Sequence, residues 1–355
     1  MLEQLISVVS KVGMSALITC ANQVPANDVT IGQIESPAGW SYLASDFYPS
    51  NLISDVATGG WAKANGQFYF HGKNIVDAQG RDYDQGFALI KNSTLPKNKH
   101  IFLSTELRSY CSKIDGQCAV GVVLLESESR YRGLYQMTGN GNLNSDVAAL
   151  APCEYIPTAQ PTAGANLWQK LAIDYSPDGA WKYYINDVMV ASEPAGKIKA
   201  EFTSDPHIAL YMTASNNSSY TEGVYKNLVA YVGEIERGFM SASSNSATAS
   251  NVFTGGMWNS GGMPWAWISQ RLPSKKNILK VNLKVAQMPA GRTIHQIYLD
   301  GVLAKTVDSY TKDGDIVSVI FNPPVQATSI TVQTVLSPSW VAWRGFDVIT
   351  AEAVP

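Results

Sequence analysis

Short runs that alternate apolar and polar residues, separated by turn residues, recur along most of this chain. The clearest occupies residues 294–299 and 302–307, joined by Asp300 and Gly301. When apolar and polar residues alternate, every second side chain of a strand faces the core. Asp-Gly is a preferred two-residue hairpin turn. Because no convincing helical pattern interrupts such runs beyond residue 27, the sequence predicts an all-β protein built from antiparallel β-sandwiches (jelly rolls).

The length of the chain predicts two such sandwiches. The chain has 355 residues, and single domains usually have about 100–200. Residues 241–250 read SASSNSATAS, a composition typical of a linker or a domain edge. We therefore expect one sandwich over residues 25–236 and a second over residues 240–355.

Residues 1–24 predict an amphipathic helix, because apolar residues recur at spacings of three and four: Leu2, Leu5, Ile6, Val9 and Val12. Such a short helix is marginally stable alone and needs a partner. We expect it to anchor the chain or to join it into a homo-oligomer, a trimer being favoured. Two alternatives stay open: packing against the first sandwich, and an atypical signal sequence that carries Glu3 where a basic residue is usual.

The charge of the chain argues against nucleic-acid binding. Only 15% of its residues are charged and the formal net charge is −3, so no basic field would concentrate phosphate backbones. No apolar run is long enough for a transmembrane helix. A surface of low charge, rich in Ser, Thr, Asn and Gly, favours an extracellular, cell-surface or virion protein.

The cysteines and carboxylates suggest no cofactor. Cys111 and Cys118 flank six residues that read as a hairpin turn, so a disulfide and two unlinked thiols both remain open. Residues 77–84 carry three carboxylates around a turn but lack the spacing of an EF-hand loop. Ca²⁺ there is an alternative to a solvated turn, and otherwise no metal is expected.

Residues 168–232 resemble the back half of a concanavalin A-like (laminin G-like) jelly roll. The resemblance rests on WQKLAIDYSPDGAWKYYINDVMVASEP, PHIALYMTA and GVYKNLVAYVG. In the first of these segments, residues 176–179 (Ser-Pro-Asp-Gly) and Asn186-Asp187 predict tight turns between strands. That superfamily includes lectins, adhesion modules and glycoside hydrolases. Its hydrolase branch usually carries a Glu-x-Asp-x-x-Glu strand, which is absent here. Glu126 and Glu128 are the nearest paired carboxylates, but they read as a strand end with solvated charges, so catalysis is not expected.

Residues 240–350 resemble a discoidin-like, galactose-binding-type jelly roll. The resemblance rests on Trp265-Ala-Trp267 with the residues to Leu272, and on the closing SWVAWRGFDVI. The family typically has an Asp-Gly turn before its first Trp. The corresponding loop here reads FTGGMW, without the Asp, so a structural calcium ion is in doubt.

The candidate binding residues all belong to the second sandwich: Trp258, Asn259, Trp265, Arg271, Trp340 and Arg344. Exposed aromatic planes stack on the apolar faces of sugars, and arginines donate forked hydrogen bonds. The loop between Trp258 and Trp265 is rich in Gly, so we expect Trp258 to be exposed, whereas Trp267 and Trp343 are expected in the core.

These features predict a non-catalytic protein that binds cell-surface glycan or glycoprotein. Overall the chain resembles a phage tail-fibre, spike or adhesin protein, which implies host attachment. Two alternatives stay open. One is a secreted glycoside hydrolase or lyase with an accessory binding module, and the other is a structural virion decoration or assembly protein.

Overall fold

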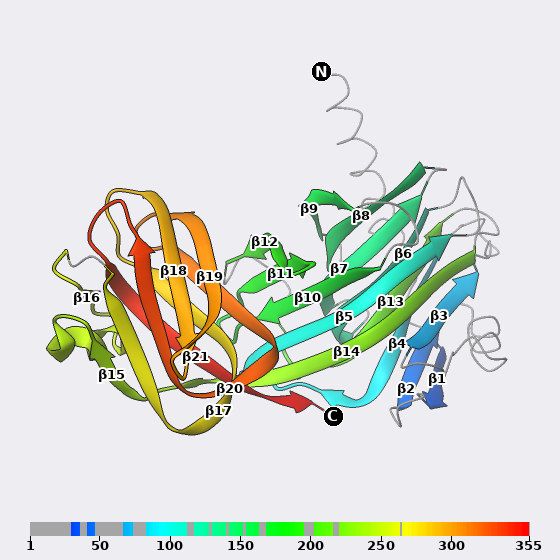
Figure 1. The fold of residues 1–355 in the computed structure, drawn as a ribbon. Coiled ribbons are helices and arrows are strands. Elements are labelled where there is room, and N and C mark those ends of the chain that lie inside the picture. Colours follow the sequence, from blue (N-terminus) through cyan, green and yellow to red (C-terminus); the bar gives the residue numbers. More distant parts are fainter. Residues whose placement is uncertain are drawn as a thin grey trace, which may run out of the picture. The chain divides into compact units, whose positions relative to one another are not determined.

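The chain divides into two compact units, residues 1–230 with 354–355 and residues 231–353 (Figure 1). Residues 1–24, where a helix is expected, lie outside the described residues, so that helix stays a prediction. The computed structural model describes residues 30–35, 41–46, 67–73, 83–111, 117–127, 130–139, 142–151, 154–162, 168–194, 202–215, 220–262 and 265–354.

The first unit contains two sheets. One has the strand order β1 (Thr30–Glu35), β2 (Ser41–Asp46), β4 (Tyr83–Thr94), β13 (His207–Ser215), β6 (Gln117–Ser127), β7 (Arg130–Gly139), β8 (Asn142–Ala151) and β9 (Glu154–Thr162). The other has the order β12 (Val188–Glu193), β11 (Trp181–Ile185), β10 (Gln169–Tyr175), β5 (His100–Cys111) and β14 (Tyr220–Glu236), and β3 (Gln67–Lys73) also pairs with β14.

The turns expected between β10, β11 and β12 are confirmed. The amide of Gly179 donates a hydrogen bond of 2.8 Å to the carbonyl oxygen of Ser176. Asn186 and Asp187 have φ angles of 50° and 66°, the left-handed values that a tight two-residue hairpin turn requires. These three strands pair antiparallel, so local turn chemistry sets this part of the sheet.

Cys111 and Cys118 do not sit across a hairpin. Cys111 ends β5 and Cys118 lies at the start of β6, and these two strands belong to different sheets. β5 pairs with β10, whereas β6 pairs with β7 and β13. The expected hairpin is therefore wrong, because β5 and β6 follow one another in the chain but lie in different sheets.

The second unit is a sandwich of long antiparallel strands. Its main sheet has the order β21 (Ala342–Val354), β17 (Trp267–Val285), β20 (Ile316–Leu336), β18 (Gly291–Leu299) and β19 (Val302–Thr311). β15 (Phe239–Ala242) pairs with β17, and β16 (Trp258–Asn259) pairs with β21. Asp300 and Gly301 join β18 to β19 with φ angles of 48° and 82°. That hairpin, and the all-β antiparallel sandwich architecture, are confirmed.

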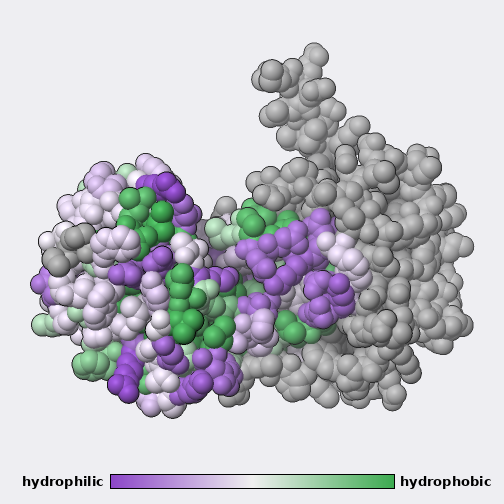
Figure 2. All heavy atoms as spheres, viewed as in Figure 1, coloured by the Kyte–Doolittle hydropathy of each residue, from purple (hydrophilic) through white to green (hydrophobic). Residues whose placement is uncertain are grey.

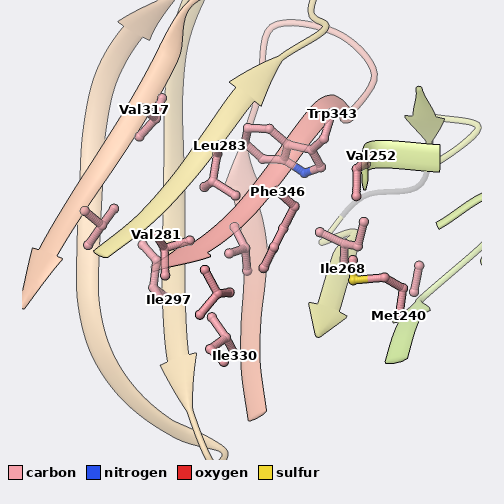
Figure 3. Packing of buried hydrophobic residues seen from close by; sticks show 14 of the residues in the cluster. Met240, Val252, Ile268, Val281, Leu283, Ile297, Val317, Ile330, Trp343 and Phe346 are labelled. Atoms are coloured by element: carbon pink, nitrogen blue, oxygen red, sulfur yellow. The ribbon is translucent and has the colours of Figure 1, made fainter. Parts of the chain in front are cut away.

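Register shifts divide β17 into two parts. They lie between Arg271 and Lys276 and between Ile278 and Lys280. The first part pairs with β15 and with the end of β20, and the second part pairs with β21 and with the start of β20. The divided strands enclose one apolar core, into which Val281, Leu283, Ile297, Ile330, Trp343 and Phe346 point (Figure 3).

Residues 241–250 are a folded part of the second unit, so their interpretation as a linker is wrong. They contain the end of β15 and the start of the 3-10 helix η4 (Ser246–Phe253). Ala249 and Val252 of η4 are buried and belong to the apolar core. The boundary between the units falls earlier, at residues 230 and 231, within β14.

Candidate functional site

Four loops meet at one end of the second unit, which we call the loop end; their described residues are 260–262, 265–266, 286–290, 312–315 and 337–341. Backbone hydrogen bonds tie them together. The amide of Ser260 donates a hydrogen bond of 2.8 Å to the carbonyl oxygen of Val341. The amide of Ala286 donates one of 3.1 Å to the carbonyl oxygen of Ala342, and the amide of Val285 donates one of 2.8 Å to the carbonyl oxygen of Asp315. Loops carried at one end of a rigid sandwich are where binding residues usually lie.

Trp265 projects from the loop end. Trp265 is 60% exposed. Its backbone φ angle of 57° is a left-handed value that bulky residues rarely adopt. The side-chain amide of Gln333 donates a hydrogen bond of 3.2 Å to the carbonyl oxygen of Trp265, which helps to hold this conformation. Backbone strain of this kind persists only where surrounding structure supports it, and such strain is common at binding sites.

Trp340 is the second exposed indole at the loop end. It is 41% exposed and lies in the loop between β20 and β21. Met288, in the loop between β17 and β18, is also exposed. In Figure 2 the described surface of the second unit mixes hydrophilic residues with small hydrophobic patches. Exposed aromatic and thioether side chains gathered on one end of a folded unit suggest a contact surface.

The expectation that Trp258 is exposed is wrong. Trp258 is 0% exposed and lies opposite Trp343, which is 2% exposed. Its indole N–H donates a hydrogen bond of 2.9 Å to the carbonyl oxygen of Ser244. The flanking glycines suggested an open loop, but antiparallel pairing of β16 with β21 draws the ring into the core. Trp343 is a core residue as expected, whereas Trp267 is half-buried.

The other expected residues divide into two groups. Asn259 lies at the loop end, where its side-chain oxygen accepts a 2.8 Å hydrogen bond from the amide of Gly261. Arg344 also lies there and pairs with Asp313 through two hydrogen bonds of 3.1 and 3.2 Å. That hydrogen bonding lowers the pKa of Asp313. Arg271 is exposed but lies further along β17, opposite Ser329, so the structure does not bring it to the loop end.

A buried polar layer supports the loop end from below. Thr311 donates to the side-chain oxygen of Gln287 over 3.2 Å and lies 3.2 Å from the hydroxyl of Thr293. His295 lies 3.0 Å from the hydroxyl of Thr334, whose amide donates to Ala266, the residue after Trp265. Sequence reasoning missed this layer, because its members are scattered over three strands and a loop.

His295 makes the stability of the second unit depend on pH. Burial lowers the pKa of His295 from 6.5 to about 4, and the imidazole meets the ring of Trp343 edge-on at 4.9 Å. The folded state keeps His295 neutral, whereas the unfolded state binds a proton below its ordinary pKa. Stability is therefore expected to fall by up to about 3 kcal/mol as the pH drops from 6.5 to 4.

Denaturant unfolding followed by tryptophan fluorescence across this pH range measures the effect. In the variant His295→Gln, the free energy of unfolding should no longer fall by this amount between pH 6.5 and pH 4. An unchanged slope in the variant would show that other groups cause the pH dependence.

Glu126 of the first unit is not placed as a catalytic acid. The amides and hydroxyls of Thr203 and Ser204 all donate to its carboxylate. Burial raises the pKa of Glu126, but these hydrogen bonds outweigh it and lower the pKa from 4.5 to about 2. Glu126 therefore stays ionised and fastens the segment at Thr203 to β6. Glu128 lies outside the described residues, as do residues 77–82 of the proposed calcium turn.

Among the described residues, no group of three or more His, Cys, Asp or Glu side chains is placed to hold a metal ion. Within the same residues, no helix is both long and apolar enough to cross a membrane.

No protein-family model matches the chain, and no curated protein matches it in sequence. Solved structures with some likeness include the family 32 carbohydrate-binding module of C. perfringens NanJ in complex with galactose. It has 15% sequence identity and a TM-score of 0.25, and the match covers 31% of this chain and 91% of that chain. Chitosan-binding module 2 of a Paenibacillus sp. IK-5 chitosanase/glucanase, in complex with chitotriose, has 20% sequence identity and a TM-score of 0.25. That match covers 31% of this chain and 93% of the module. The striped bass (Morone saxatilis) fucolectin has 10% identity, coverages of 81% and 86%, and a TM-score of 0.30. The resemblances of the two units to laminin G-like and discoidin-like domains stay predictions.

Proposed function

We propose that this protein binds carbohydrate without cleaving it, and that the loop end of the second unit holds the sugar. The observation that carries the proposal is the pair of exposed indoles, Trp265 and Trp340, on loops that hydrogen bonds fix to one end of a sandwich. A sugar ring has an apolar C–H face that stacks on an exposed aromatic plane. Asn259 ends the adjoining strand β16, and a side-chain amide at that position can reach the hydroxyl rim of a sugar.

A glycan array followed by calorimetric titration tests this proposal. Trp265→Ala and Trp340→Ala are each expected to weaken binding of the best array ligand roughly tenfold, because each removes one stacking surface. Phe239→Ala is the matched control, since Phe239 is an exposed ring on β15 of the same unit, away from the loop end. Absence of signal on every glycan would favour a structural role instead.

Absence of catalysis is part of the proposal. It is supported by the carboxylate of Glu126, whose hydrogen bonds to Thr203 and Ser204 commit it to a structural role. Glycoside hydrolysis needs two carboxylates about 5–10 Å apart, one of them protonated. Release of new reducing ends from any array ligand that binds would overturn this part and favour the hydrolase alternative.

We further propose that the binding serves attachment, as a component of a virion or of another extracellular surface. The low charge of the chain supports this setting, and several copies joined through residues 1–24 would strengthen weak single-site binding. Light scattering of the full chain and of a chain lacking residues 1–24 measures the copy number. A monomer in both cases would contradict oligomerisation through this segment.

A further inference from the structure

We propose that the second unit has another contact surface for a neutral oligosaccharide, on the outside of its sheet rather than at the loop end. We call it the polar sheet face. It shares the ligand class with the proposed function but uses different side chains, contributed by the start of β17, the end of β20 and by β18: Trp267, Ser269, Gln296, Tyr298, Thr331 and Gln333.

Strand register places these six residues in two rows across the sheet. Trp267 pairs with Gln333, which pairs with Gln296 on the next strand. Ser269 pairs with Thr331, which pairs with Tyr298. The residues between them along each strand, Ile268, Ile297 and Val332, are buried in the core. Because successive side chains alternate between faces, both rows lie on the outer face.

Hydrogen bonds hold the face in place before any ligand binds. The hydroxyls of Ser269 and Thr331 lie 2.7 Å apart. The hydroxyl of Tyr298 donates to the side-chain oxygen of Gln296 over 2.7 Å. Among the described residues, the amide N–H groups of Gln296 have no partner, so they remain available to a ligand. A surface ordered in advance loses less conformational entropy on binding.

The chemistry of the face selects the ligand class. None of its six side chains carries a charge, and they offer hydroxyls, amides and two aromatic rings. Two charged groups at its margin are engaged by other residues: Arg292 pairs with Asp308, and Asp300 accepts hydrogen bonds from the amides of Thr328 and Ser329. Arg271 is exposed in the next row along β17, opposite Ser329. A neutral, hydroxyl-rich ligand can exchange hydrogen bonds with the six side chains of the face, whereas an ionised ligand would find no countercharge among those six.

The rows are long enough for several sugar units. The first row continues to Thr306 of β19, opposite Gln296, and the second continues to Ser241 of β15, opposite Ser269. Each row therefore crosses four strands, and because neighbouring strands lie about 4.8 Å apart, each row spans roughly 14 Å. The face therefore suits an extended oligosaccharide better than a single sugar.

The test is calorimetric titration of the full chain with neutral hexasaccharides (cellohexaose, xylohexaose and mannohexaose) and with a hexagalacturonate as the charged counterpart. Ser269→Ala and Tyr298→Phe each remove one hydroxyl and are expected to weaken binding of a neutral hexasaccharide roughly three- to tenfold. Ser318→Ala is the matched control, since its hydroxyl bonds Asn282 over the same 2.7 Å further along β17 and β20. Thermal unfolding checks that all three variants fold.

The outcomes separate the two sites. Weaker binding in the sheet-face variants alone supports the polar sheet face. If Trp265→Ala and Trp340→Ala abolish hexasaccharide binding while Ser269→Ala and Tyr298→Phe leave it unchanged, the polar sheet face is wrong and the loop end stands. The reverse result supports the polar sheet face and overturns the loop end. Equal affinity for the charged hexamer, or no binding of any neutral hexasaccharide, overturns the polar sheet face.

Discussion

Replacing Glu193 with glutamine is expected to destabilise the first unit by about 3–5 kcal/mol. Glu193 of β12 accepts hydrogen bonds from Arg132 of β7 and Tyr183 of β11, both at 3.0–3.1 Å. Arg132 and Glu193 are only 2% and 4% exposed, and their strands belong to different sheets. Removing the carboxylate charge leaves the guanidinium in the interior without this partner, and desolvation of a buried charge is strongly unfavourable.

Denaturant unfolding followed by tryptophan fluorescence, to which Trp181 on β11 contributes beside Tyr183, measures the loss. Asp187→Asn is the control, because Asp187 pairs with Lys170 over 2.7 Å at the surface and asparagine tolerates its left-handed backbone. The control should lose less than about 1 kcal/mol. Joint replacement of Arg132 and Glu193 by Met and Leu should recover much of the loss. If Glu193→Gln and the control lose equal stability, burial of the Arg132–Glu193 pair does not set its contribution to stability.

Replacing Trp258 with alanine is expected to destabilise the second unit by about 3–5 kcal/mol. The ring is fully buried against Trp343, so its removal leaves a cavity. The carbonyl oxygen of Ser244 also loses the hydrogen bond that the indole N–H donates to it. Trp340→Ala is the comparison variant. Trp340 is 41% exposed and lies in a loop, so its replacement should cost much less stability than that of Trp258, about 1 kcal/mol or less.

The two tryptophan variants therefore separate folding from binding. Thermal and denaturant unfolding report the loss in Trp258→Ala, and glycan titration reports the loss in Trp340→Ala. A Trp258→Ala protein that unfolds like the native chain but no longer binds glycan would contradict the burial of this ring and return Trp258 to the binding site.

Local sequence predicted much of the strand architecture. The alternation around Asp300 and Gly301 predicted β18, β19 and their hairpin, and the turn at Asn186 and Asp187 predicted the hairpin of β11 and β12. These elements depend on period-two patterning and on left-handed turn residues, both of which are readable within about ten residues. Trp265 and Trp340 were named as candidate binding residues, and both are exposed.

Predictions that depended on distant partners were wrong. The glycines near Trp258 suggested exposure, but β21, more than eighty residues later in the chain, pairs with β16 and buries the ring. The Ser-rich segment suggested a linker, but Ala249 packs into the core. Cys111 and Cys118 suggested a hairpin, but their strands enter different sheets. Local composition carries no information about which remote strand will cover a segment.

The antiparallel sandwiches and their hairpins follow from the amino-acid sequence, because side-chain periodicity and turn conformation are properties of neighbouring residues. Three other features become visible only in the folded protein: the tryptophans that face solvent, the meeting of Arg132 and Glu193 inside the first unit, and the outer face that Ser269, Tyr298 and Gln296 share. Those outcomes depend on strand pairing between segments far apart in the chain, and the free energy of burying apolar rings and pairing buried polar groups selects that pairing.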